Sequence, residues 1–257
     1  MRNNYLITKE TSDVPGVLIA VEGVDGSGKS TQIQLLRDWL SSQGLRVHFS
    51  EWNSSLLVKE ATKKGKKNKL LTPTTFSLIH ATDFADRYER QIYPMLKAGF
   101  IVLCDRYKYT AFARDGVRNC APLWLEELYS FARDPDIIYY YDLPLEVSLS
   151  RILSGRPTLK YHEAGMDLNL SNDITESYKL YQGKIRESYL SMAKKYNFNI
   201  INANREIHEQ QIDLRNEVEK RVNLTSFREW QNTNFCLLYT SDAADDMQCV
   251  DLGGRRI

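Results

Sequence analysis

The chain has 257 residues, of which 42% are hydrophobic and 26% charged, a composition typical of one globular α/β domain or at most two small ones. Its formal net charge of +1 gives no overall reason to expect nucleic acid or an anionic membrane as a partner. No apolar run approaches the roughly 20 residues of a membrane span, and the N-terminus lacks the apolar core of a signal peptide, so a cytoplasmic location is expected. The four cysteines show neither a disulfide framework nor the spacing of a zinc site.

After a polar arm of residues 1–15, strand-like and helix-like segments alternate along the chain. The predicted strands are short and rich in β-branched or aromatic residues, and they cover residues 17–21, 46–50, 100–104, 136–141 and 198–201. Helices are predicted over residues 29–42, 74–98, 123–133, 145–154, 174–196 and 207–222. This alternation predicts βαβ units, a parallel sheet and one α/β domain spanning residues 16–224.

Two segments interrupt the alternation. The lysine-rich run 59–69 has the composition of a solvated helix end and loop rather than of a binding patch. The segment 155–173 combines Gly, Pro and charged residues and is long for a simple connection, so it is expected to be a lid.

The last part of the chain, residues 225–257, is expected to be a tail outside the domain. From about residue 236 the sequence resembles the conceptual translation of an adapter used in preparing sequencing libraries, and this part is excluded from functional reasoning. The true C-terminus is therefore not defined by this sequence.

A phosphate-binding loop is predicted between the first strand and the first helix. Gly23, Gly28, Lys29 and Ser30 match the pattern Gly-x-x-x-x-Gly-Lys-Ser/Thr, in which backbone N–H groups and a helix N-terminus surround a phosphate. Lys29 is expected to reach the β- and γ-phosphates of ATP, and the Ser30 hydroxyl to bind Mg²⁺. The residues expected to contact the nucleotide are Gly23, Asp25, Gly26, Ser27, Gly28, Lys29, Ser30 and Thr31.

Asp105 and Arg106 follow the predicted strand 100–104, at the sheet edge where ligands bind in open α/β folds. A carboxylate at position 105 can hold Mg²⁺ or its waters, and an arginine at position 106 can bind a phosphate with two parallel hydrogen bonds. Asp25 lies inside the glycine-rich loop, where a sugar hydroxyl is a natural partner for its carboxylate.

The stretches EGVDGSGKSTQ, DRY, PMLKAG and YYYDLPLEVSLSRI resemble the thymidylate kinases, P-loop enzymes that phosphorylate dTMP with ATP. The resemblance covers about residues 17–222. It implies the three-layer sandwich of P-loop NTPases, with a five-stranded parallel sheet and helices on both faces. Members are often homodimers, and the partners implied are ATP and a nucleoside monophosphate rather than nucleic acid or a membrane.

The resemblance also implies residue roles. Asp25 matches the carboxylate that binds the sugar 3′-hydroxyl, Arg106 the arginine that holds the acceptor phosphate, and Asp105 the acidic residue near Mg²⁺. Arg151 and Arg156 are the candidates for neutralising the transferring phosphoryl group from the lid. Phe84 and Arg87 are the candidates for stacking on the base and hydrogen-bonding to it.

Two stretches differ from the usual thymidylate kinase pattern. Family members carry Arg-Glu-Pro or Arg-Phe-Pro after the second strand, where this chain has Glu51, Trp52 and Asn53, and the stretch KYTAFARDGVRN lacks the family's Gln. The acceptor base therefore stays open. The alternatives are a P-loop kinase with another acceptor or with polyphosphate as donor, and a regulator that binds nucleotide without turnover. Retention of Lys29 and Arg106 favours an enzyme.

Overall fold

The computed structural model of this chain describes residues 14–238, and one parallel sheet forms its centre. The strands are β1 (Val17–Gly23), β2 (Val47–Glu51), β3 (Ile101–Asp105), β4 (Ile137–Asp142) and β5 (Asn199–Asn202). They lie in the order β2-β3-β1-β4-β5, and each neighbouring pair is parallel. The predicted strands and their parallel arrangement are confirmed. Because β1 lies between β3 and β4, the carboxyl ends of these three strands meet at one edge.

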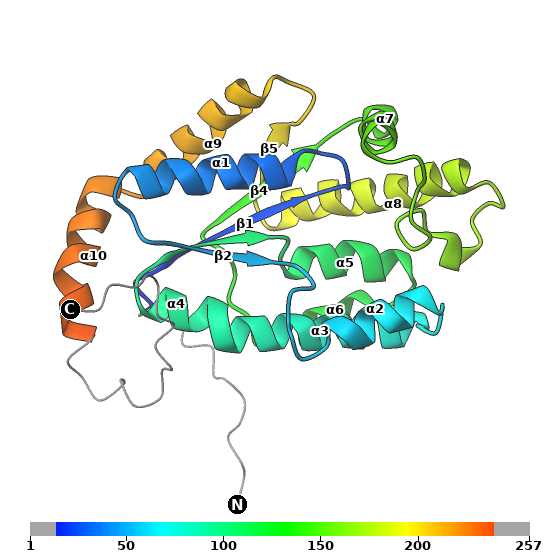
Figure 1. Cartoon of the computed structure of the whole chain (residues 1–257), viewed down its shortest axis with the longest axis horizontal. Helices are drawn as coiled ribbons and strands as arrows, with labels where there is room; N and C mark the ends of the chain where they lie inside the picture. The colour runs from blue at the N-terminus through cyan, green and yellow to red at the C-terminus, as the bar shows by residue number, and fades with distance from the viewer. Residues whose placement is uncertain (1–13, 239–257) are drawn as a thin grey trace, which may run out of the picture.

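Helices cover both faces of the sheet, which confirms the predicted three-layer α/β sandwich. The helical segments are α1 (Lys29–Ser42), α2 (Lys59–Lys67), α3 (Pro73–Arg87), the π-helical turn η1 (Tyr88–Ile92), α4 (Tyr93–Lys97), α5 (Lys108–Val117), α6 (Pro122–Leu128), α7 (Leu145–Gly155), the short 3₁₀ turn η2 (Met166–Leu168), α8 (Ile174–Lys195), α9 (Ile207–Arg221) and α10 (Leu224–Leu238). Helices α1 and α9 lie on one face, and α3, α4, α5 and α8 lie on the other (Figure 1). No helix between residues 14 and 238 is both long and apolar enough to cross a lipid bilayer.

The structure contains helices that the sequence pattern did not indicate. Helix α2 occupies most of the lysine-rich run, where a helix end and a loop were expected, and only Thr62 and Gly65 are buried along it. Helix α5 directly follows the Asp105-Arg106 pair. The small buried face of α2 gives the sequence almost no apolar periodicity, so the pattern does not predict that helix. The predicted helix 74–98 is divided by η1, which precedes Pro94, a residue without an N–H for the helical ladder.

Helix α10 lies within the segment expected to be a tail, and it packs onto the domain. The Gln231 amide donates a hydrogen bond to the carbonyl of Gly99 (2.8 Å) and accepts one from the Arg46 N–H (2.9 Å). Gly99 has a φ of 76°, and a Cβ at this position would lie 2.0 Å from the Trp230 ring, so only glycine fits beneath the helix. The segments 1–13 and 239–257 lie outside the described residues, and with them most of the expected arm and adapter-derived end.

Glu22 at the end of β1 connects three elements beneath the functional edge of the sheet. It is fully buried and accepts hydrogen bonds from the Tyr107 N–H (2.8 Å), the Thr110 hydroxyl (2.6 Å) and the Tyr189 hydroxyl (2.8 Å). Burial raises the pKa of Glu22, although the bonds from Thr110 and Tyr107 oppose the rise. These contacts hold the start of α5 and the middle of α8 against β1. They therefore position Arg106, which lies between the end of β3 and the start of α5.

Candidate functional site

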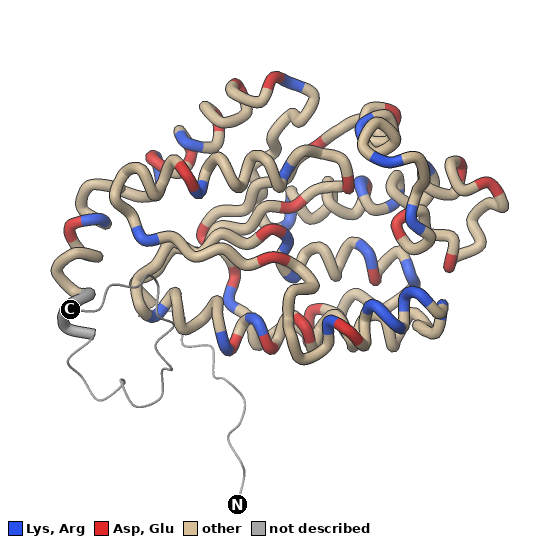
Figure 2. Tube along the Cα trace, viewed as in Figure 1, with Lys and Arg blue, Asp and Glu red and all other residues tan. Residues whose placement is uncertain are grey.

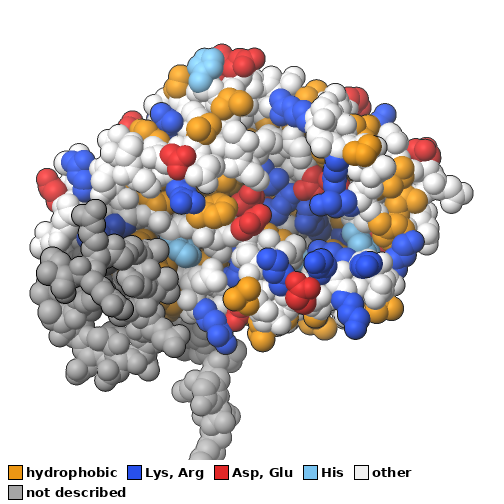
Figure 3. Space-filling view, viewed as in Figure 1, with side chains coloured by type: hydrophobic (Ala, Val, Ile, Leu, Met, Phe, Trp, Pro, Cys, Tyr) orange, Lys and Arg blue, Asp and Glu red, His pale blue; other side chains and the backbone are white. Residues whose placement is uncertain are grey.

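A cavity of about 640 Å³ opens at the carboxyl ends of β1, β2 and β3, and its volume falls in the range of small-ligand sites. Its lining is rich in charged residues, with more basic than acidic side chains. The charged residues that line it are Lys29, Lys66, Lys67, Arg106, Arg114, Arg118, Arg156, Lys160, Asp25, Glu51, Asp105 and Glu163. Figure 3 shows the hollow with basic side chains gathered in and around it. Such a lining fits a ligand with several negative charges.

The glycine-rich loop forms the phosphate end of this cavity. Gly26 and Gly28 have φ values of 77° and 85°, in the left-handed region that glycine adopts readily. Helix α1 begins at Lys29, and the first turn of a helix leaves N–H groups without intrahelical partners. The Lys29 ammonium donates to the carbonyl of Val24 (3.3 Å), and burial lowers the pKa of Lys29 to about 8, with Arg106 acting in the same direction. A bound phosphate would relieve both effects.

Ser30 and Asp105 lie together beside this loop, as expected for a shared Mg²⁺ site. The Ser30 hydroxyl donates to Oδ2 of Asp105 (2.8 Å), while Oδ1 of Asp105 is buried without a hydrogen-bond partner in the described part of the chain. These oxygen atoms suit Mg²⁺, which prefers one or two protein ligands together with phosphates and water. Residues 14–238 contain no group of three or more His, Cys, Asp or Glu side chains that could hold a metal ion alone.

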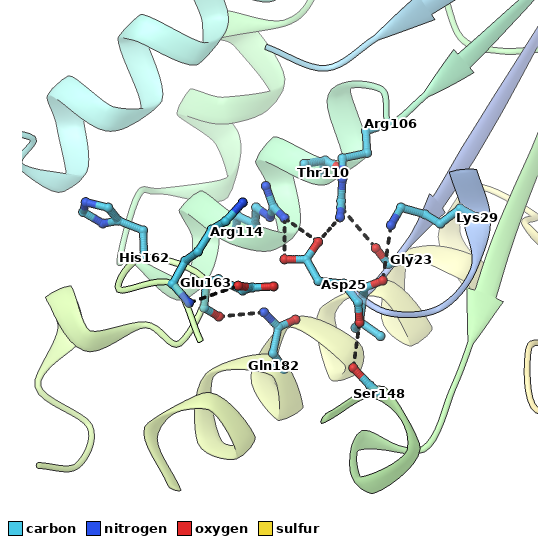
Figure 4. A network of polar contacts seen from close by, with 12 residues as sticks. Gly23, Asp25, Lys29, Arg106, Thr110, Arg114, Ser148, His162, Glu163 and Gln182 are labelled. Carbon is cyan, nitrogen blue, oxygen red and sulfur yellow. Dashed lines mark hydrogen bonds and ion pairs between the residues drawn. The ribbon is translucent and has the colours of Figure 1, made fainter. Parts of the chain in front are cut away.

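Asp25 forms the centre of an ion-pair cluster with two arginines (Figure 4). Arg106 bonds to Oδ1 of Asp25, and Arg114 contacts its two oxygens at 3.2 and 3.3 Å. Burial opposes ionisation of Asp25, but Arg106 and Arg114 outweigh it and hold the pKa of Asp25 well below its usual range. Arg106 also donates to the carbonyl of Gly23 (3.1 Å), and its φ of 72° costs roughly 1 kcal/mol for a residue with a Cβ.

Of the two arginines expected to neutralise the transferring phosphoryl group, one lies in the expected lid and reaches the cavity. Arg156 lines the cavity and is bonded to Glu163, whose carbonyl accepts a hydrogen bond from the Gln182 amide (2.9 Å). Arg151 is exposed on α7 and does not line the cavity. The structure therefore separates the two arginines that the resemblance treated together.

The distal end of the cavity is formed by the segment after β2, by α2, α3, α5 and α8, and by the expected lid, whose His162 lies on the side of Asp25 away from Lys29 (Figure 4). We use this term for the end lined by Trp52, Asn53, Lys66, Phe76, Arg118, His162 and Tyr181. The Arg118 guanidinium is bonded to Asp167 (2.8 Å) and to the Tyr181 hydroxyl, and it lies 4.4 Å from the centroid of the Phe76 ring. Burial opposes ionisation of Asp167, but hydrogen bonds from His162 and Arg118 lower its pKa to about 2.

The two residues predicted to contact a base lie beneath the cavity instead of lining it. Phe84 is fully buried and packs edge-on against Tyr107, with ring centroids 4.9 Å apart. Arg87 is also fully buried and donates to Asp83 (2.9 Å) and to the Ser50 hydroxyl (2.9 Å). The prediction that these side chains bind a base is corrected, because α3 turns both of them toward the core.

Other residues at the cavity were not identified from the sequence, notably Arg114, Arg118 and Lys66. One signal was present for the first two: Arg106, Thr110, Arg114 and Arg118 recur every four residues, which is the spacing of one helix face. Lys66 carried no such signal, because the run around it contains lysines at many positions. Figure 2 shows the lysines along α2, beside the expected lid.

Comparisons with known proteins agree with this architecture. A family model described as thymidylate kinase matches residues 21–214. The chain is 49% identical over 201 residues to the probable thymidylate kinase 2 of Saccharolobus solfataricus, covering 78% of this chain and 94% of that protein. It is 31% identical over 211 residues to the probable thymidylate kinase of Thermococcus kodakarensis, covering 77% and 96%. It is also 31% identical over 213 residues to the thymidylate kinase of Thermosipho africanus, covering 80% and 99%.

Proposed function

Since the chain belongs to the thymidylate kinase family, we propose that it transfers the γ-phosphoryl group of ATP to dTMP and produces dTDP and ADP. The observation that carries this proposal is the Asp25–Arg106–Arg114 cluster beside Lys29. A nucleotide-binding regulator has no need of two arginines on the far side of its phosphate loop. The comparisons likewise favour dTMP over the other acceptors that the sequence left open, and they favour ATP over polyphosphate as the donor.

On the donor side, we assign the triphosphate to the loop 23–31. Lys29 would contact the β- and γ-phosphates, and the N–H groups at the start of α1 would bind their oxygens. The free oxygen of Asp105 and the hydroxyl of Ser30 fit a Mg²⁺ ion, which neutralises charge on the phosphates when bound. The fit is one of donor type, since both side chains present hard oxygen ligands at one point.

On the acceptor side, we assign the sugar 3′-hydroxyl to the Asp25 carboxylate and the monophosphate to Arg106. An oxygen of the acceptor phosphate attacks the γ-phosphorus as the bond to the β,γ-bridging oxygen breaks, and ADP leaves with that oxygen. The protein forms no covalent bond in this step. Its contribution is to align the two phosphates and to stabilise the charge that spreads over the transferring group, for which Arg156 is the residue at hand on the expected lid.

The proposal is tested by a coupled ADP-release assay on the full chain with ATP and Mg²⁺. Each ribo- and deoxynucleoside monophosphate is supplied separately, and ADP release without any acceptor is subtracted. We expect dTMP to give the highest kcat/KM. Preference for another nucleotide would change the assigned acceptor, and ATP binding without turnover of any acceptor would contradict the kinase assignment.

Two further expectations from the sequence stay predictions. These are the homodimer that the family resemblance implies and the cytoplasmic location. Light scattering of the purified chain over a range of concentrations measures the first directly, and fractionation of cells that produce the protein measures the second.

A further inference from the structure

The geometry of the cavity determines where the base of an acceptor nucleotide lies. If the acceptor phosphate is next to Lys29 and Arg106, the nucleotide extends away from them along the cavity. Figure 4 shows Asp25 between Lys29 on one side and His162 on the other, so the base reaches the distal end. Phe76 and Trp52 line this end and provide apolar ring surface for a base.

Lys66 stands out at the distal end because its ammonium has no acidic partner. Its Nζ lies 5.3 Å from the centroid of the Phe76 ring, and within residues 14–238 it makes neither a hydrogen bond nor an ion pair. The carbonyl of Lys66 contacts His162 Nε2 (3.3 Å), so the backbone is held while the amine stays available.

The groups that face Lys66 do not offset its charge. Arg114 on α5 and Arg118 directly after it repel Lys66. On α3, His80 adds no negative charge, and Asp83 is already bonded to Arg87. Burial lowers the pKa of Lys66 to about 8, and the two arginines act in the same direction, while Asp83 and Asp25 oppose them weakly. A half-buried donor with these neighbours is stabilised by a ligand that offers an electron-rich oxygen.

Two other polar atoms at the distal end also lack partners in the described part of the chain, namely Nε1 of Trp52 and Oδ1 of Asn53. Trp52 is 8% exposed, and its N–H is a donor. Lys66 Nζ is a second donor without a hydrogen-bond partner among the described residues, whereas Asn53 Oδ1 is an acceptor and Arg118 is already bonded to Asp167 and Tyr181. Thymine and uracil present a carbonyl oxygen at C4, whereas cytosine presents an amino group there, which is a donor. The unpaired donors of Lys66 and Trp52 therefore match the carbonyl oxygens of a keto base, and the unpaired Oδ1 of Asn53 can accept from the ring N–H that such a base carries and cytosine lacks.

We propose that Lys66 is a specificity-determining residue that donates a hydrogen bond to a carbonyl oxygen of a keto-pyrimidine acceptor. This inference rests on the proposed function, because it assumes that a nucleoside monophosphate occupies the cavity with its phosphate at Arg106. It assigns hydrogen bonding to the base to a residue of α2, because Arg87, for which this role was predicted, is buried and paired with Asp83.

The test compares three variants of the full chain: Lys66→Met, which removes the donor; Lys66→Arg, which keeps one; and Lys64→Met, a matched control on the exposed side of the same helix. The kcat/KM values for dTMP, dUMP and dCMP are measured with saturating ATP and Mg²⁺, together with the KM for ATP. Calorimetric binding of dTMP and dCMP without ATP provides a readout that does not depend on turnover. Because the contact to His162 is made by the backbone, Lys66→Met leaves it in place.

We expect Lys66→Met to lower kcat/KM and affinity for dTMP and dUMP by about 10- to 100-fold, and those for dCMP by less than about threefold. Lys66→Arg should retain much of the discrimination, and Lys64→Met all of it. An equal loss for dTMP and dCMP would overturn the inference, since it would mean that Lys66 attracts any anion. Unchanged values in Lys66→Met would overturn it as well.

Failure of the proposed function has a different signature. If the unsubstituted enzyme releases no ADP with dTMP, the assigned reaction is wrong whatever the variants do. In that case the ratio of dTMP to dCMP affinities in Lys66→Met, measured by calorimetry, still decides the role of Lys66.

Discussion

Two arginines at the phosphate end of the cavity and Lys66 at its distal end are held in different ways. At the phosphate end, Arg106 and Arg114 share the carboxylate of Asp25, so each guanidinium has a partner before any ligand binds. At the distal end, the ammonium of Lys66 lies against the Phe76 ring without a carboxylate among the described residues. A paired arginine is held in one geometry, whereas an unpaired donor gains most from a ligand that supplies the missing acceptor.

This difference suggests a division of labour. Phosphoryl transfer requires fixed positions and stabilisation of charge that develops in the transition state, and preorganised pairs serve that requirement. Discrimination between bases requires a group whose desolvation is compensated by the correct ligand only. We therefore expect substitutions at the phosphate end to lower the rate for every acceptor and substitutions at the distal end to change the preference among acceptors.

The largest effect is expected for Lys29→Ala. Removing the buried ammonium takes away the cation that we assign to the β- and γ-phosphates, and kcat should fall by roughly 10²- to 10³-fold with every acceptor. Steady-state kinetics with dTMP and dUMP measure this, and circular dichroism checks the fold. A loss of activity with only one of the two acceptors would contradict the proposal that the phosphate end acts on every acceptor alike.

A smaller effect, confined to the acceptor, is expected for Arg106→Ala. The kcat/KM for dTMP should fall by roughly 100-fold, since a charged contact to the acceptor phosphate is lost, while the KM for ATP should change by less than about threefold. Initial rates with each substrate varied in turn separate the two constants. Equal changes in both would remove Arg106 from the acceptor side.

Arg106→Gly is the control for the backbone at this position. It loses the same side chain but relieves the left-handed φ of 72°, so it should be more stable than Arg106→Ala by about 1 kcal/mol with the same kinetic defect. Thermal denaturation of the two variants gives the difference. If Arg106→Ala alone is inactive, its defect comes from the fold rather than from the lost guanidinium.

The two arginines near the expected lid provide a comparison of intermediate size. Arg156 lines the cavity and Arg151 does not, so Arg156→Ala should lower kcat by about tenfold and Arg151→Ala by less than about twofold. Rates at saturating ATP and dTMP are sufficient for this comparison. A larger loss for Arg151→Ala would show that the segment 155–173 rearranges to bring α7 over the cavity.

A smaller effect than that of Arg156→Ala is a dependence of acceptor binding on pH. Because the pKa of Lys66 is lowered to about 8, its charged form contributes below that pH and is lost above it, so the KM for dTMP should rise about fourfold from about pH 7 to about pH 8.5. Lys66→Arg should flatten this rise, since a guanidinium stays charged over the range. A rise of the same size in both proteins would assign it to another group.

Much of the phosphate end was predictable because its residues are close in sequence. The strand, the turn and the first turn of α1 form one continuous stretch, and Lys29 and Ser30 take their places from the backbone path of that stretch. Asp105 and Arg106 were found because a parallel strand places the residues after it at the ligand-binding edge. In each case a local pattern was enough to specify the position.

The distal end was predicted poorly because it is assembled from segments far apart in the chain. Phe84 and Arg87 lie on α3, and whether they face the cavity or the core depends on how that helix rotates against Tyr107 and Ser50. Lys66 belongs to a short helix with almost no buried face, so no periodicity distinguished it from its neighbouring lysines.

The amino-acid sequence by itself determined the five strands, their alternation with helices, the glycine-rich loop and the acidic-basic pair at the end of β3, because hydrophobic periodicity and glycine placement act over a few residues. Only the tertiary structure decided which basic side chains meet around Asp25, that Arg87 of α3 is enclosed by the core, and which lysine of α2 lies against the Phe76 ring at the cavity. These depend on packing between elements separated by tens of residues, where burial and charge pairing are properties of the assembled fold.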